Sequence, residues 1–174
     1  MRNWFMLSLV GLDQPRIVAK LSAGLCKSGC NLGDSSMVRL GKYFTVMLMV
    51  EHEGNKKSLE TIVASICNPL NLESNLVKLD DGNPQHSEPD VRISLFAEDR
   101  TGIVQDATTL LADAGLNILH LESNLNEDSE AGTYFIHLEG TLSEGLSPIN
   151  IVLEKLENEK GIKSHLIPVN AQVS

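Results

Sequence analysis

Apolar residues change their spacing along the chain twice, in the same order each time. Residues 4–12 are almost continuously apolar and end at Asp13. Apolar residues then recur with helical spacing at Ile17, Val18, Leu21 and Leu25. A second apolar run at 91–97 leads to Asp99 and to a second helical stripe. A continuous apolar run is typical of a buried strand and a spacing of three or four of a helix face, so the chain predicts a strand followed by a helix at two places.

These two places match residue by residue at a constant distance in the sequence. The matched residues are 86 positions apart, in the pairs Asp13 and Asp99, Ile17 and Ile103, Val18 and Val104, Leu25 and Leu111, Gly29 and Gly115, and Asn31 and Asn117. A fixed offset over a span of this length indicates an internal duplication. We therefore expect two copies of one structural unit.

Each copy continues with the same series of elements after its first helix. These elements are a hairpin at 34–50 or 118–138, a second helix near 59–66 or 149–156, and a last strand at 72–79 or 162–169. The order in each copy is therefore β-α-β-β-α-β. We predict an α+β, ferredoxin-like fold in which two helices cover one face of an antiparallel sheet.

A polar segment separates the two copies. Residues 81–89 include Pro84 and Pro89 and contain no apolar run, a composition typical of a linker. We therefore predict a first domain at 1–80, a linker at 81–89 and a second domain at 90–174.

Charge is distributed unequally between the predicted domains. The chain has 42% apolar residues, enough to fold, and a net charge of −9. Residues 1–80 contain nine Lys and Arg against seven Asp and Glu, whereas residues 81–174 contain five against sixteen. Attraction to nucleic-acid phosphates depends on clustered basic residues. The charge therefore disfavours direct nucleic-acid binding and favours a protein partner.

The predicted strand at 43–50 has apolar side chains on both of its faces. They alternate as Val46, Leu48 and Val50 on one face against Thr45, Met47 and Met49 on the other. The helices of this fold cover only one face of the sheet, so something else must cover the second. We expect the two domains to pack on each other within the chain, and a homodimer to extend this packing.

The sequence contains no recognisable motif for catalysis, metal binding or membrane insertion. It has no P-loop, nucleophile elbow or H-E-x-x-H motif, so no catalytic residue is assigned and no enzyme is expected. Cys26, Cys30 and Cys67 have neither metal-ligand nor disulfide spacing, and we expect no metal and no cofactor. Since neither a signal-peptide pattern nor a run of about 18 apolar residues is present, we expect a cytoplasmic protein without a membrane partner.

Two short motifs carry a family resemblance. In the second copy, Asp99-Arg100-Thr101-Gly102-Ile103-Val104 followed by Gly115-Leu116-Asn117-Ile118 resembles the ACT domain, an amino-acid-sensing module. The first copy has the same frame, with Arg16 at the glycine position. The resemblance extends over essentially all residues outside the linker. It implies that Asp99 and Asn117, and in the first copy Asp13 and Asn31, contact an amino acid at an interface between domains.

Elementary physics supports a ligand site in the same strand-to-helix loops. The first N–H groups of a helix lack partners and carry the positive end of the helix dipole. A ligand carboxylate could therefore be held by the N–H groups of Gly102, Ile103 and Val104, or by those of Arg16, Ile17 and Val18. Asp99 can accept hydrogen bonds from the ammonium group, and Asn117 can both donate and accept. In the first copy, the Arg16 side chain either fills the space in front of these N–H groups or pairs with the ligand carboxylate. The site in the second copy is therefore the better preserved.

Plainer roles would also account for these polar residues. Asp13 and Asp99 could simply cap the helices that follow them. Asn31 and Asn117 could be turn residues after a helix end. Neither role needs a ligand.

A closer resemblance lies in the first copy. Residues 29–35 and 41–48 are similar to the first ACT domain of the glycine cleavage system transcriptional repressors, small bacterial proteins that consist of two ACT domains. This implies a regulator without its own DNA-binding domain, which responds to glycine and contacts the transcriptional activator protein of the glycine cleavage operon. The alternative is a stand-alone ACT amino-acid sensor that modulates a metabolic enzyme.

Overall fold

The chain forms two compact units, Met1–Gln85 and His86–Ser174. A computed structural model describes residues 2–80, 87–126 and 132–169. Most of the predicted linker at 81–89, namely residues 81–86, lies outside the described residues, and so do residues 127–131 of the predicted hairpin at 118–138.

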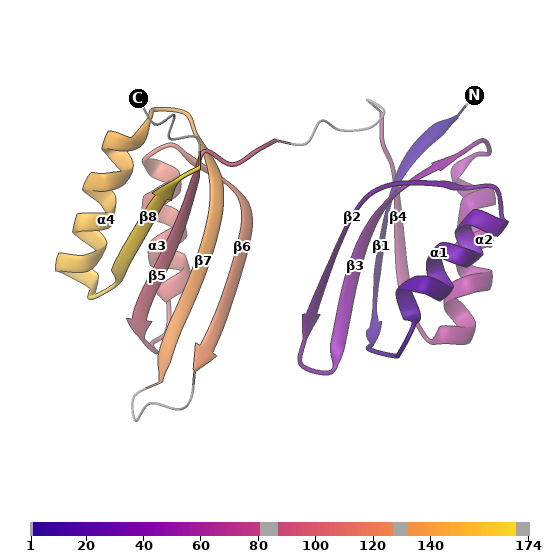
Figure 1. The fold of residues 1–174 in the computed structure, drawn as a ribbon, viewed down its shortest axis with the longest axis horizontal. Helices are drawn as coiled ribbons and strands as arrows, with labels where there is room; N and C mark the ends of the chain where they lie inside the picture. Colours follow the sequence, from indigo (N-terminus) through magenta and orange to yellow (C-terminus); the bar gives the residue numbers. More distant parts are fainter. Residues whose placement is uncertain (1, 81–86, 127–131, 170–174) are drawn as a thin grey trace. The chain divides into compact units, whose positions relative to one another are not determined.

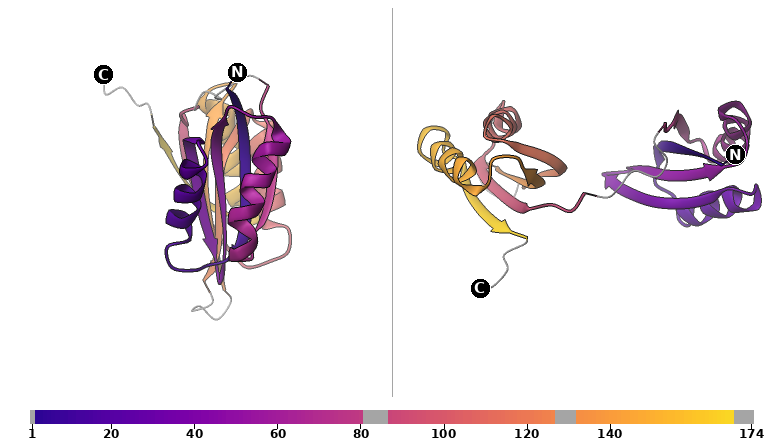
Figure 2. Two further views of the ribbon diagram at one scale, coloured as in Figure 1. Left: turned by 90° about the vertical axis from the view of Figure 1, so that its right-hand side faces the viewer. Right: turned by 90° about the horizontal axis from the view of Figure 1, so that it is seen from above.

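The first unit is a four-stranded antiparallel sheet with two helices on one face (Figures 1 and 2). Its elements are β1 (Asn3–Leu12), α1 (Ile17–Lys27), β2 (Asn31–Leu40), β3 (Tyr43–His52), α2 (Lys56–Cys67), a 3-10 turn (Asn68–Leu70) and β4 (Glu73–Lys78). The strand order across the sheet is β2-β3-β1-β4.

The second unit repeats this arrangement. Its elements are β5 (Val91–Glu98), α3 (Ile103–Asp113), β6 (Leu116–Asn126), β7 (Thr133–Leu142), α4 (Leu146–Lys160) and β8 (Lys163–Pro168). The strand order is β6-β7-β5-β8, and α3 and α4 lie on the same face of the sheet (Figure 1). The predicted ferredoxin-like β-α-β-β-α-β order is confirmed in both units.

Each unit has a hydrophobic core of its own between sheet and helices. In the first unit, alternate residues of β1 point into the core, and Phe5, Leu7 and Leu9 are at most 1% exposed. Three residues of the predicted helical stripe, Ile17, Leu21 and Leu25, are buried and face them, whereas Val18 is 37% exposed. In the second unit Ile103, Ala107 and Leu111 form the same stripe. The two cores have no residue in common.

The sheet face opposite the helices differs strongly between the units. In the first unit it carries exposed apolar side chains, which we call the first open face: Val10, Leu12, Val38, Leu40, Tyr43, Met47 and Val77. The prediction that β3 is apolar on both faces is thus confirmed. The corresponding face of the second unit is more polar, although Phe96, Phe135 and Ile167 are partly exposed on it. There Arg92 donates to Glu139 at 2.7 Å, and Ser94 lies 3.4 Å from the Nδ1 atom of His137.

Candidate functional site

The strand-to-helix loops of the two units share one backbone feature directly before the helix. The residue before each helix is left-handed, with φ 65° at Arg16 and φ 90° at Gly102. This conformation costs a residue with a Cβ about 1–2 kcal/mol and costs glycine little. A Cβ placed on Gly102 would meet nothing within 4 Å. The second loop is therefore open in front of α3, where the first loop carries the Arg16 side chain.

The N–H groups that begin the two helices differ in their hydrogen bonds. In the first unit the N–H of Ile17 donates to the carbonyl of Gln14 at 3.2 Å. Within the described residues, the N–H of Ile103 makes no such bond. The side chains of Ile17 and Ile103 are core residues, so only their backbone could meet a ligand. The N–H of Ile103 in the second loop is therefore free of partners in the part of the chain that the structure describes, whereas the corresponding N–H of the first loop is bonded.

The two loop aspartates also differ in their partners. The Asp13 carboxylate pairs with Arg39 at 3.3 Å. The exposed Asp99 carboxylate makes no ion pair or hydrogen bond with the residues that the structure describes. Neither α1 nor α3 has a side-chain cap, so the alternative that these aspartates cap the helices is wrong. Asp99 keeps its carboxylate available to a ligand.

The two motif asparagines lie in strands, far from the loops. Asn117 pairs with Thr141 in the sheet, whereas Glu98, the residue before Asp99, pairs with Thr133. Eight strand residues span about 27 Å, so Asp99 and Asn117 lie at opposite ends of one sheet. Asn31 is likewise remote from Asp13 and lies opposite Glu51 in the sheet. The alternative that these asparagines are turn residues is wrong, and no single amino acid can contact both motif residues of one unit.

A network of charges holds the second loop against both helices of its unit. The Arg100 guanidinium donates to the Asp106 carboxylate at 2.8 Å, and the Lys160 ammonium lies 3.6 Å from the other oxygen of that carboxylate. The hydrogen bond from Arg100 and the charge of Lys160 together hold the pKa of Asp106 below its ordinary 3.8. One carboxylate thus fixes two cations.

This network predicts that the stability of the second unit depends on pH in the acid range. Because the pKa of Asp106 is lower in the folded state, its stabilising effect is complete above the ordinary value of 3.8 and is lost as the pH falls through the folded value. Asp106→Asn should therefore lower the stability of the second unit at pH 7 and change it little at pH 2.5. Urea unfolding followed by hydrogen exchange at both pH values measures this. An equal loss at both pH values would contradict it.

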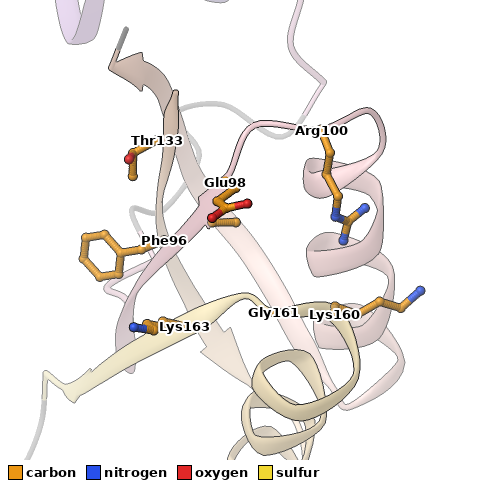
Figure 3. Close-up of a pocket in the computed structure, with 8 residues that line it drawn as sticks. Phe96, Glu98, Arg100, Thr133, Lys160, Gly161 and Lys163 are labelled. Carbon is orange, nitrogen blue, oxygen red and sulfur yellow. The ribbon is translucent and has the colours of Figure 1, made fainter. Parts of the chain in front are cut away.

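A hollow of about 600 Å³ lies beside this network (Figure 3). It is lined by Phe96, Ala97, Glu98, Arg100, Thr133, Lys160, Gly161 and Lys163. None of these residues was among the predicted site residues. The sequence did contain one indication of a basic site, since Arg100, Lys160 and Lys163 are three of only five basic residues in 81–174. Their gathering around one hollow depends on tertiary structure.

The described residues offer neither a metal site nor a membrane span. They contain no group of three or more His, Cys, Asp or Glu side chains that could hold a metal ion. None of the helices among them is long and apolar enough to cross a bilayer.

Comparisons with known proteins agree with the duplicated fold. Two ACT domain models match the chain, one at residues 3–69 and one at 91–147. A UPF0237 protein of Methanococcus maripaludis is 32% identical over 73 residues, which are 42% of this chain and 80% of that protein.

Two solved structures are similar over nearly their whole length. A protein from Galdieria sulphuraria has a TM-score of 0.79 at 22% identity, with 97% of this chain and 99% of that chain covered. A candidate glycine cleavage system transcriptional repressor has a TM-score of 0.71 at 18% identity, with 96% and 97% covered. At these identities the likeness shows the fold, including the tandem arrangement of two such units in one chain.

Proposed function

This chain belongs to the ACT domain family, and from that premise we propose that it is a regulatory protein that senses an amino acid through its second ACT domain. The observation that carries the proposal is the loop between β5 and α3. There the Asp99 carboxylate and the Ile103 N–H are both free of partners among the described residues, and Gly102 leaves the space between them and solvent open. A carboxylate and a helix N–H complement the ammonium and carboxylate ends of an amino acid.

The proposed effector is glycine, and the proposed partner is the transcriptional activator protein of the glycine cleavage operon. Support comes from the resemblance of residues 29–35 and 41–48 to such repressors, and from the likeness of the fold to a candidate member. The net charge of −9 is consistent with a repressor that contacts a protein and not DNA.

Two measurements test this proposal. Isothermal titration with glycine and with serine is expected to give heat for at least one of them, and absence of heat with both would contradict amino-acid sensing. Affinity capture from an extract of the source cells is expected to retain a transcriptional activator. Capture of a metabolic enzyme in its place would favour the stand-alone sensor, and retention of the purified chain on operator DNA at physiological salt would contradict action through a protein partner.

The first open face predicts self-association. Leu40 is 67% exposed and Met47 is 48% exposed on it, and an apolar face of this kind favours an interface. We expect the chain to be a dimer and the double variant Leu40→Lys with Met47→Lys to be a monomer by analytical ultracentrifugation. Ile151→Lys, at a residue of α4 that is also 67% exposed, is the matched control and should stay dimeric. A monomeric parent chain at every concentration would contradict this prediction.

A further inference from the structure

The hollow beside Arg100 has the size and position of a second ligand site. Its volume of about 600 Å³ lies within the range of about 300–1,000 Å³ that is usual for small-molecule sites. This is far more space than glycine or serine would occupy. None of Asp99, Gly102 and Ile103 lines it. Its occupant would therefore be a different ligand from the proposed amino acid.

Positive charge is concentrated at this hollow although its unit is strongly acidic. Arg100 comes from the loop after β5, Lys160 is the last residue of α4 and Lys163 is the first residue of β8. Figure 3 shows Arg100 and Lys160 on one side of the hollow and Lys163 on the other. The opposing carboxylates are Glu98 in the hollow and Asp106 beneath Arg100 and Lys160. Three cations against two carboxylates leave a local positive excess.

The three cations differ in the ion pairs and hydrogen bonds that they already make within the unit. Asp106 anchors Arg100 and Lys160, and Lys160 also complements the carboxyl end of α4. Lys163 makes no ion pair or hydrogen bond within the described part of the chain. Arg100 uses only part of its donor set, since it has five N–H groups and its bonds go to Asp106 and the Thr101 carbonyl. Both retain donors for an anion.

The other walls of the hollow restrict the chemistry of the ligand further. Phe96 offers an aromatic ring that is 36% exposed and is held edge to face against Phe135, with ring centroids 5.3 Å apart. The Glu98 carboxylate lies between the two groups of cations (Figure 3) and can accept hydrogen bonds from hydroxyl or amino groups. A phosphate has three terminal oxygens for donors that approach from separate elements.

We propose that this hollow binds a small phosphorylated metabolite, with its phosphate on Arg100 and Lys160, its other hydrogen-bonding groups on Glu98 and Lys163, and its apolar or planar part against Phe96. This site does not depend on the proposed amino-acid sensing. The two sites share one loop, since Arg100 follows Asp99 directly in the sequence, but Asp99 does not line the hollow.

The test uses AMP and inorganic pyrophosphate as probes with the full chain. Both are titrated by calorimetry, and the backbone amide signals of Ala97, Gly161 and Lys163 are followed by nuclear magnetic resonance. We expect AMP to bind and to shift these signals. Lys163→Gln should weaken AMP binding about tenfold, the effect of losing one charge-assisted hydrogen bond. Lys155→Gln removes the same charge from an exposed part of α4 outside the hollow, and should change the affinity less than twofold.

Two further variants separate the parts of the proposal. Arg100→Gln should weaken AMP and pyrophosphate alike, whereas Phe96→Leu should weaken AMP alone. The site is disproved if neither probe shifts the three amide signals, or if Lys155→Gln weakens binding as much as Lys163→Gln. An equal effect of Phe96→Leu on the two probes would disprove the role of Phe96. Glycine binding, titrated in parallel, reports on the amino-acid site independently.

Discussion

Asp99→Ala is expected to lower the affinity for glycine about tenfold or more, because it removes a charge-assisted hydrogen bond to the ammonium group. Asn117→Ala should have a similar effect if both residues contact the ligand. Since these residues lie about 27 Å apart in one sheet, the ligand must then meet Asp99 of one domain and an asparagine of another. We predict that the second domain of another copy supplies Asn117.

Mixing the two variants tests whether the glycine site is shared between two copies of the chain. In a two-fold symmetric dimer, each heterodimer of Asp99→Ala with Asn117→Ala has one site that lacks both residues and one site that is intact. An equal mixture should therefore recover about one quarter of the glycine sites at full affinity. Asp113→Ala, an exposed acidic position at the far end of α3, is the control and should bind like the parent. No recovery in the mixture would contradict a site shared between copies.

The repeated fold could be predicted because every local signal agreed. The offset of 86 residues joined two identical series of strand and helix patterns. Of the predicted stripe Ile17, Val18, Leu21 and Leu25, all but Val18 lie on the buried face of α1, and Val18 is 37% exposed. Propensity, periodicity and duplication all pointed to the same packing, which is the condition under which a sequence alone specifies a fold.

The separation of Asp99 from Asn117 is a consequence of topology that motif spacing conceals. The helix α3 carries the chain back across the sheet, so β6 starts at the end where β5 also starts. Asp99 follows the opposite end of β5. Asp99 and Asn117 are only 18 positions apart in the sequence, but they lie at opposite ends of the sheet. The strand order, and not the motif, decides which site residues can share a ligand.

The hollow beside Arg100 could not be predicted from local patterns. Arg100 and Lys163 are more than sixty positions apart in the sequence, and each has an ordinary local setting, one in a loop and one at the start of a strand. Only the pairing of Phe96 with Lys163 across β5 and β8 brings them to one place. Sites built from the ends of several elements follow from tertiary structure alone.

Phe5→Ala is expected to destabilise the first unit by about 3–5 kcal/mol, as for other large core residues, and to leave the second unit unchanged. Phe5 is 0% exposed in a core that shares no residue with the second. Trp4, the single tryptophan, reports on the first unit during urea unfolding. Domains of this size are stable by about 5–15 kcal/mol, so the fluorescence midpoint should fall sharply.

The matched variant in the second core is Leu156→Ala, since Leu156 is also 0% exposed. It should leave the Trp4 midpoint in place while amide exchange shows that β5 and β7 unfold at lower urea. Together the two variants would show that each ACT domain folds on its own core, so that a lesion in one unit leaves the ligand site of the other intact. If Leu156→Ala moves the Trp4 midpoint as far as Phe5→Ala does, the two units unfold as one, and ligand binding to the second domain should then stabilise the first.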